Sequence, residues 1–127
     1  MSFMAKSNKE IALEVLKRAF VDRDPTVVAE YFGVNYKQHN PVIPDGPSAI
    51  AGMIPTLTGL TYEAGMAVAD GDLVMVHGRY TGWGPKPMVA VDIFRVKDGK
   101  VIEHWDVMQE EVPPTETKSG NAMFTKL

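Results

Sequence analysis

The residues best suited to chemistry lie in the segment 91–106. Asp92 sits in an apolar run of alternating character, Val-Asp-Ile-Phe, and His104 follows in Glu-His-Trp-Asp. Aspartate is disfavoured within β-strands, and a carboxylate among apolar side chains is a typical general base. The segment therefore makes Asp92 a candidate general base. A structural acid bonded to a tyrosine, histidine or arginine, or an acid on the solvent face, is the alternative.

The register of a hairpin over this segment decides which side chains share a face. A three-residue loop at 97–99 pairs Val96 with Lys100 and places Asp92 opposite His104. A two-residue turn would instead pair Asp92 with Trp105. We favour the first register because it brings an acid to a base. Its inner face then holds Asp92, Phe94, Ile102, His104, Asp106 and Met108. Its outer face holds Val91, Ile93, Arg95, Glu103, Trp105 and Val107, with Arg95 and Glu103 near enough to pair.

Further candidates lie outside the hairpin. Hydrogen-bonding side chains are concentrated in Tyr-Lys-Gln-His-Asn-Pro at residues 36–41, beside a rigid bend. This predicts either a polar pocket wall, in which His39 or Asn40 orients a carbonyl, or simple turn chemistry. Trp83 lies between two glycines and is expected to act as a lid or as a packing plug. The histidines show no close His-x-His pair, so no metal site is expected.

Composition excludes several classes of function. The 127 residues predict one domain over 1–127. Thirteen basic against sixteen acidic residues leave a net charge of −3, which disfavours binding to nucleic acid or anionic membranes. The chain has no cysteine, which excludes disulfides and thiol nucleophiles and suits a cytoplasmic location. It shows no membrane-length apolar run and no secretory signal. Motifs for nucleotide binding, serine hydrolysis and zinc proteolysis are also absent.

The elements that must position these residues are helices first and strands second. A capping box at Ser7 and Glu10 begins one helix. A second helix starts at Asp24-Pro25 and stops at Gly33. A third covers about 48–57 and breaks near its proline.

Alternating apolar residues then predict four strands joined by turns at Asp70-Gly71 and Asp98-Gly99. The expected strands are 62–68, 73–81, 88–96 and 100–109. In the first of them Tyr62, Ala64, Met66 and Val68 share one face. Helices followed by strands indicate an α+β protein. The tail 115–127 either packs back on the body or is disordered.

In this order, the segments resemble SnoaL-like proteins of the nuclear-transport-factor-2-like superfamily. The resemblance rests on residues 36–41, 70–74, 91–95, 98–107 and 120–124, and extends over nearly the whole chain. It implies an α+β cone-shaped barrel in which N-terminal helices pack on a curved, mostly antiparallel sheet that encloses a pocket. It also implies a homodimer formed through the outer face of the sheet.

The resemblance also implies a chemistry. Polyketide cyclases of this family close rings by intramolecular aldol condensation without metal or cofactor. Their acid/base aspartate lies on a strand ahead of the final hairpin turn, a position that falls on Asp92. We therefore expect a cofactor-independent lyase or isomerase that acts on a small hydrophobic carbonyl compound, with Asp92, His104 and His39 catalytic. Substrate binding is expected at His77, Tyr36, Asn40, Trp83, Phe94 and Asp106.

Two other kinds of function stay open at this point. The same pocket would serve a non-catalytic carrier or sensor of small molecules. The outer sheet face would instead serve an interaction module, through an apolar patch of Val91, Ile93, Trp105 and Val107.

Overall fold

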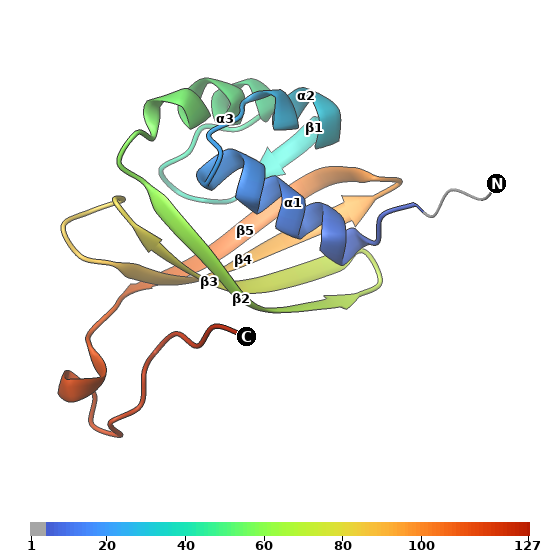
Figure 1. Ribbon diagram of the computed structural model, residues 1–127. Helices are drawn as coiled ribbons and strands as arrows, with labels where there is room; N and C mark the ends of the chain where they lie inside the picture. The colour runs from blue at the N-terminus through green and yellow to red at the C-terminus, as the bar shows by residue number, and fades with distance from the viewer. Residues whose placement is uncertain (1–4) are drawn as a thin grey trace.

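Three helices lie on one face of a five-stranded sheet in the computed structural model, which describes residues 5–127 (Figure 1). The helices are α1 (Asn8–Phe20), α2 (Thr26–Tyr31) and α3 (Pro47–Met53), and the 3₁₀ turn η1 (Ile54–Thr56) continues α3. The strands are β1 (Phe32–Gln38), β2 (Thr61–Asp70), β3 (Leu73–Thr81), β4 (Met88–Lys97) and β5 (Lys100–Glu110). A second 3₁₀ turn, η2 (Pro114–Glu116), follows β5.

The sheet has the order β1-β5-β4-β3-β2, and all its pairs are antiparallel except β1 with β5. The α+β class and the curved, mostly antiparallel sheet are thus confirmed. The sheet does not close into a barrel, because β1 and β2 form two separate edges. Among residues 5–127, no helix is long and apolar enough to span a membrane.

The helices begin and end close to the expected residues. The Ser7 hydroxyl accepts from the Glu10 amide at 3.1 Å, and the Glu10 carboxylate accepts from the Ser7 amide at 3.0 Å. This capping box satisfies two backbone donors at the start of α1. Before α2, the Asp24 side chain accepts from the Thr26 amide at 3.0 Å. The helix begins at Thr26, one residue later than expected, with Pro25 directly before it. Pro55 lies in η1, where the expected break occurs.

Strand β1 is the element that the sequence pattern did not predict. Gly33 was expected to end the second helix, but that helix ends at Tyr31 and Gly33 lies within the strand. A side chain at this position would come within 3.2 Å of the Ile102 side chain, so glycine lets β1 approach β5. Parallel pairing with a strand some seventy residues away is a tertiary contact that leaves little local signal.

Strand β2 also departs from its expected face. Tyr62 is 8% exposed, but Met66 and Val68 are 47% and 62% exposed. The pairing with β3 shifts between Ala64 and Ala67. A bulge of this kind reverses which side chains point inward, so the single face predicted for β2 is wrong beyond Ala64.

The β4–β5 hairpin has a two-residue turn, so the register we favoured is wrong. Asp98 and Gly99 both have positive φ, 51° and 76°, as the tightest hairpin turns require. A register shift above the turn then pairs Asp92 with Asp106 and Phe94 with His104.

The observed hairpin register lies two residues from the favoured one. Because side chains alternate with a period of two, a shift of two residues leaves each polar side chain on its predicted face of the sheet. Asp92, His104 and Asp106 still share the inner face, and Arg95 on the outer face lies 3.4 Å from the Glu103 carboxylate.

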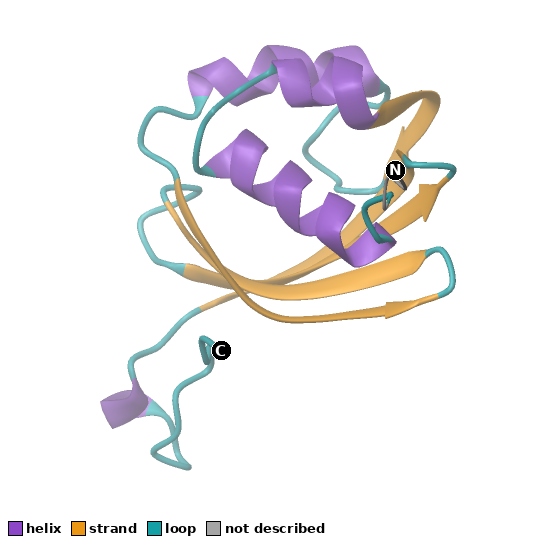
Figure 2. Ribbon diagram, turned by 45° about the vertical axis from the view of Figure 1, so that its right-hand side comes forward, coloured by secondary structure: helices purple, strands orange, loops and turns teal. Residues whose placement is uncertain are grey.

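The C-terminal tail returns to the outer face of the sheet, opposite the helices (Figure 2). The Phe124 ring lies 5.7 Å from the His77 ring, and a side chain at Gly65 would collide with Phe124 and with the Thr125 carbonyl. Of the two alternatives for the tail, packing back on the body is the one observed.

Candidate active site

A cavity of about 290 Å³ lies between the helices and the inner face of the sheet. Most of its wall is apolar, contributed by α1, α3, the segment after β1 and the strands. Its polar lining groups come from β1, β3, β4, β5 and two loops, and they are Tyr36, Gln38, Asn40, Tyr80, Trp83, Asp92, His104 and Asp106.

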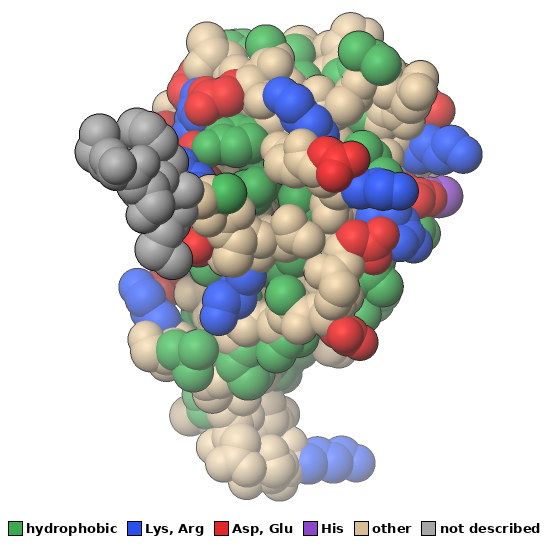
Figure 3. All heavy atoms as spheres, turned by 90° about the vertical axis from the view of Figure 1, so that its right-hand side faces the viewer, with side chains coloured by type: hydrophobic (Ala, Val, Ile, Leu, Met, Phe, Trp, Pro, Cys, Tyr) green, Lys and Arg blue, Asp and Glu red, His purple; other side chains and the backbone are tan. Residues whose placement is uncertain are grey.

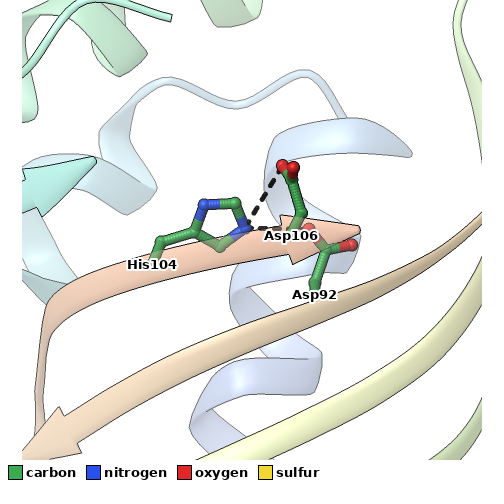
Figure 4. Close-up of side chains that lie close together, drawn as sticks. All are labelled: Asp92, His104 and Asp106. Atoms are coloured by element: carbon green, nitrogen blue, oxygen red, sulfur yellow. Dashed lines mark hydrogen bonds and ion pairs between the residues drawn. The ribbon is translucent and has the colours of Figure 1, made fainter. Parts of the chain in front are cut away.

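Asp92 and His104 form a hydrogen-bonded pair at the floor of this cavity (Figure 4). They are only 2% and 8% exposed. His104 Nε2 lies 2.8 Å from Asp92 Oδ1, and the Tyr80 hydroxyl donates to Asp92 Oδ2 at 2.7 Å. Both carboxylate oxygens therefore have a partner, as burial of a charged group requires.

The hydrogen bonds of Gln38 fix which nitrogen of His104 carries a proton. Gln38 Oε1 accepts from the Asn40 backbone amide at 3.1 Å, so this end of the side chain is the oxygen. The same oxygen lies 2.7 Å from His104 Nδ1, and Nδ1 must therefore be the donor. Nε2 then shares a single proton with Asp92, as either an imidazolium–carboxylate or an imidazole–carboxylic acid pair.

Asp106 completes the cluster from the next inward position on β5. Asn40 Nδ2 donates to its two oxygens at 3.0 and 2.8 Å. The orientation of this amide is set by Asn40 Oδ1, which accepts from the Val42 amide at 2.9 Å. His104 Nε2 lies 4.0 Å from Asp106 Oδ2, so the imidazole faces two carboxylates.

The same three residues are those that could hold a cation. Asp92, His104 and Asp106 each offer one ligand atom, and these atoms lie within 4.8 Å of one another. His104 Nε2 is already engaged by Asp92 Oδ1, so a cation would compete with the shared proton.

Burial shapes the acid–base behaviour of three tyrosines around the site. Burial raises the pKa of Tyr36 and Tyr62 well above the ordinary value, and the nearby Asp92 charge adds to it. The pKa of Tyr80 is raised for the same two reasons, with burial the larger. These phenols therefore stay protonated in the folded protein, and Tyr80 donates its proton to Asp92 rather than losing it.

We expect this to make the protein unfold cooperatively in alkali. A raised folded pKa contributes stability that is complete below the unfolded value of about 10 and is lost as pH rises above it. Tyrosinate absorbance from three of the four tyrosines should appear together with the loss of circular dichroism. Full ionisation near pH 10 with the dichroism intact would contradict this expectation.

Seven of the nine predicted site residues line the cavity. They are Tyr36, Asn40, Trp83, Asp92, Phe94, His104 and Asp106. His39 and His77 lie elsewhere, and their expected place in the pocket is corrected.

His39 follows the end of β1 and points to the outer face. Its ring stacks on Trp105 at 4.9 Å, and its Nε2 lies 2.7 Å from Glu103. That hydrogen bond holds the pKa of the Glu103 carboxyl below its usual range. His77 lies on β3 between Val76 and Gly78, which face inward, so strand alternation turns His77 outward toward the tail.

Two site residues were missed as candidates, Tyr80 and Gln38. Tyr80 shares its face of β3 with the buried Val74 and Val76, so alternation placed it inward, but nothing in the sequence showed that its hydroxyl would reach Asp92. Gln38 lies beside His104 through the parallel β1–β5 pairing, which was not predicted.

Fold and site together define the class of the protein: an α+β protein whose helices and open, mostly antiparallel sheet enclose a cavity with acidic and histidine side chains. Residues 13–104 match the family model of the SnoaL-like domain, and the chain belongs to that family. No curated protein matches the chain.

Several solved structures share the fold. An NTF2-like protein of unknown function from Cytophaga hutchinsonii is 12% identical with a TM-score of 0.73, covering 85% of this chain and 95% of that one. A candidate polyketide cyclase from Bacillus cereus is 22% identical with a TM-score of 0.63, covering 82% and 79%. An epoxide hydrolase of M. tuberculosis, described as LEH-like, is 20% identical with a TM-score of 0.63, covering 80% and 83%. At these identities the likeness concerns the fold alone.

Proposed function

We propose that the protein is a cofactor-independent acid–base enzyme that removes a proton next to the carbonyl of a small hydrophobic molecule. The observation that carries the proposal is the buried Asp92–His104 pair, in which Nδ1 is committed to Gln38 and one proton is shared. A pair with one mobile proton in an apolar cavity is suited to general acid–base catalysis. The cyclase and the epoxide hydrolase among the structural neighbours support a ligand-binding or catalytic role for the cavity.

The proposed step uses the imidazolium–carboxylate form of the pair. Asp92 takes a proton from the carbon next to the carbonyl, and the electrons of that C–H bond form the enolate. His104 donates its Nε2 proton to the developing oxygen, and Tyr80 keeps the second Asp92 oxygen in place. General acid–base help of this kind contributes roughly 10² to 10⁴ in rate.

Deuterium exchange tests the proposal without knowledge of the natural substrate. Small apolar ketones are incubated with the protein in heavy water, and loss of the α-proton signals is followed by NMR. Exchange above the buffer rate supports the proposal, and identical rates with and without a chelator support a metal-free reaction. The absence of exchange across a panel of linear, cyclic and aromatic ketones would count against it.

A non-catalytic binding protein is the second candidate. It is favoured by the hydrogen bonds that hold both oxygens of Asp92, to Tyr80 and His104, because these bonds compete with removal of a proton from a ligand. A ligand that copurifies with the protein and is recovered unchanged after long incubation would support this reading over the first.

We also propose a homodimer formed through the outer sheet face, as the family resemblance implies. Met75 and Val107 are 42% and 68% exposed on the strands, and exposed apolar side chains of this kind favour association. We expect Val107→Glu to shift the protein toward monomer in sedimentation, with the α-proton exchange rate per chain unchanged. A wild-type protein that sediments as a monomer would contradict the dimer.

A further inference from the structure

The charged groups of the cavity wall all belong to the acid–histidine cluster. No lysine or arginine occurs among the cavity-lining residues of the described chain. With one proton shared by Asp92 and His104, Asp106 leaves the wall with a net negative charge. An anionic ligand would meet this charge without a cation to offset it.

Asp106 retains unused capacity to accept hydrogen bonds. An ionised carboxylate has about four acceptor positions. Among residues 5–127, the single donor group within hydrogen-bond distance of Asp106 is Asn40 Nδ2, which bridges both oxygens. The Asp106 side chain is only 7% exposed, so a ligand in the cavity, rather than bulk water, is placed to supply the missing donor.

We infer that the cavity takes an uncharged, mostly apolar molecule bearing a hydroxyl group, and that Asp106 accepts the hydrogen bond from that hydroxyl. A neutral donor satisfies the carboxylate without the desolvation that a buried ammonium would require. Asp106 then selects which class of ligand binds, and the neighbouring Asp92–His104 pair acts on the bound ligand. The inference rests on the proposed function only in taking this cavity as the ligand site.

A matched series of bicyclic aromatic probes tests this inference by calorimetric binding to the full chain. The series is naphthalene, 2-naphthol, 2-naphthoate and 2-naphthylmethylammonium, which differ in one substituent and are small enough for a cavity of about 290 Å³. A hydrogen bond to a charged group should make 2-naphthol bind about tenfold or more tighter than naphthalene. Like-charge repulsion should make 2-naphthoate bind about 100-fold weaker than 2-naphthol.

Asp106→Asn isolates the role of the carboxylate. Asparagine can still accept from Asn40, so the loop contact is retained. The preference for 2-naphthol over naphthalene should fall to less than about threefold, while naphthalene affinity changes little. Asp70→Asn, which removes the same charge from an exposed position at the end of β2, should leave the wild-type ranking intact.

Four results would overturn the inference about Asp106 and the neutral ligand. The inference is overturned if 2-naphthoate binds wild type as well as 2-naphthol, if the ammonium probe binds best, or if no neutral probe binds at millimolar concentration. It also fails if Asp106→Asn keeps the full hydroxyl preference. None of these probes has an α-proton to exchange at a ketone, so their order of affinity tests the inference independently of α-proton exchange. If Asp106→Asn does not fold, the order of affinity for wild type alone decides the charge selectivity.

Discussion

Asp92→Asn should lower α-proton exchange of ketones by about 10² to 10⁴ while the protein stays folded. The amide cannot take a proton from carbon, but it can keep the hydrogen bonds of the carboxylate. Its oxygen accepts from Tyr80, and its nitrogen donates to His104 Nε2, which is a free acceptor once Nδ1 carries the proton. The loss should therefore appear in the rate, with the unfolding free energy equal to that of wild type or higher.

The matched control for this variant is Asp70→Asn, which changes charge equally on the exposed end of β2. It should retain the wild-type exchange rate. A fully active Asp92→Asn protein would exclude Asp92 as the base. A loss of about 2 kcal/mol or more in unfolding free energy would instead identify Asp92 as the anionic half of a structural ion pair, and would favour the binding-protein reading.

The largest effect on stability is expected from His104→Ala. This change removes the partner of Asp92 Oδ1 and also the donor to Gln38 Oε1. A buried charge left without its partner typically costs about 3–5 kcal/mol. Urea unfolding followed by circular dichroism measures the loss directly.

A double-mutant cycle shows whether the loss comes from the stranded carboxylate. Asp92→Asn combined with His104→Ala removes the charge together with its partner, so the double variant should lose less than the sum of the single changes, by about 1–3 kcal/mol. His39→Ala breaks an exposed contact with Glu103 and should cost at most about 1 kcal/mol. Equal losses for the two histidine variants, or additive changes in the cycle, would contradict the buried pair.

Charged side chains of both signs are mixed on the surface of the molecule, as the face drawn in Figure 3 shows. One arginine, Arg18, forms ion pairs with three acidic residues, Glu14, Asp24 and Glu30. These side chains are partly exposed, and ion pairs near the surface contribute little each. The largest effects on stability and rate are therefore expected in the interior.

Local patterns in the sequence were sufficient for the helices and most strands. The Ser7–Glu10 capping box and the turn at Asp98-Gly99 are short-range signals, in which the residues that interact are neighbours in the chain. Alternation within β4 and β5 also sufficed to group Asp92 with His104 and Asp106. A register error of two residues does not change which face a side chain occupies.

Tertiary structure alone decided the arrangement within that face. The pairing of β1 with β5 brings Gln38 to His104, and packing across the sheet brings the Tyr80 hydroxyl to Asp92. Gln38 and His104 are 66 residues apart, and Tyr80 and Asp92 lie 12 residues apart on neighbouring strands, at positions that are not opposite each other. The alternation within a strand encodes neither contact. The two contacts nevertheless determine the tautomer of His104 and the number of protons in the site. The sequence alone determined that Asp92, His104 and Asp106 share the face that lines the cavity. The long-range packing decided which of the other predicted residues join them and how the cluster shares its protons.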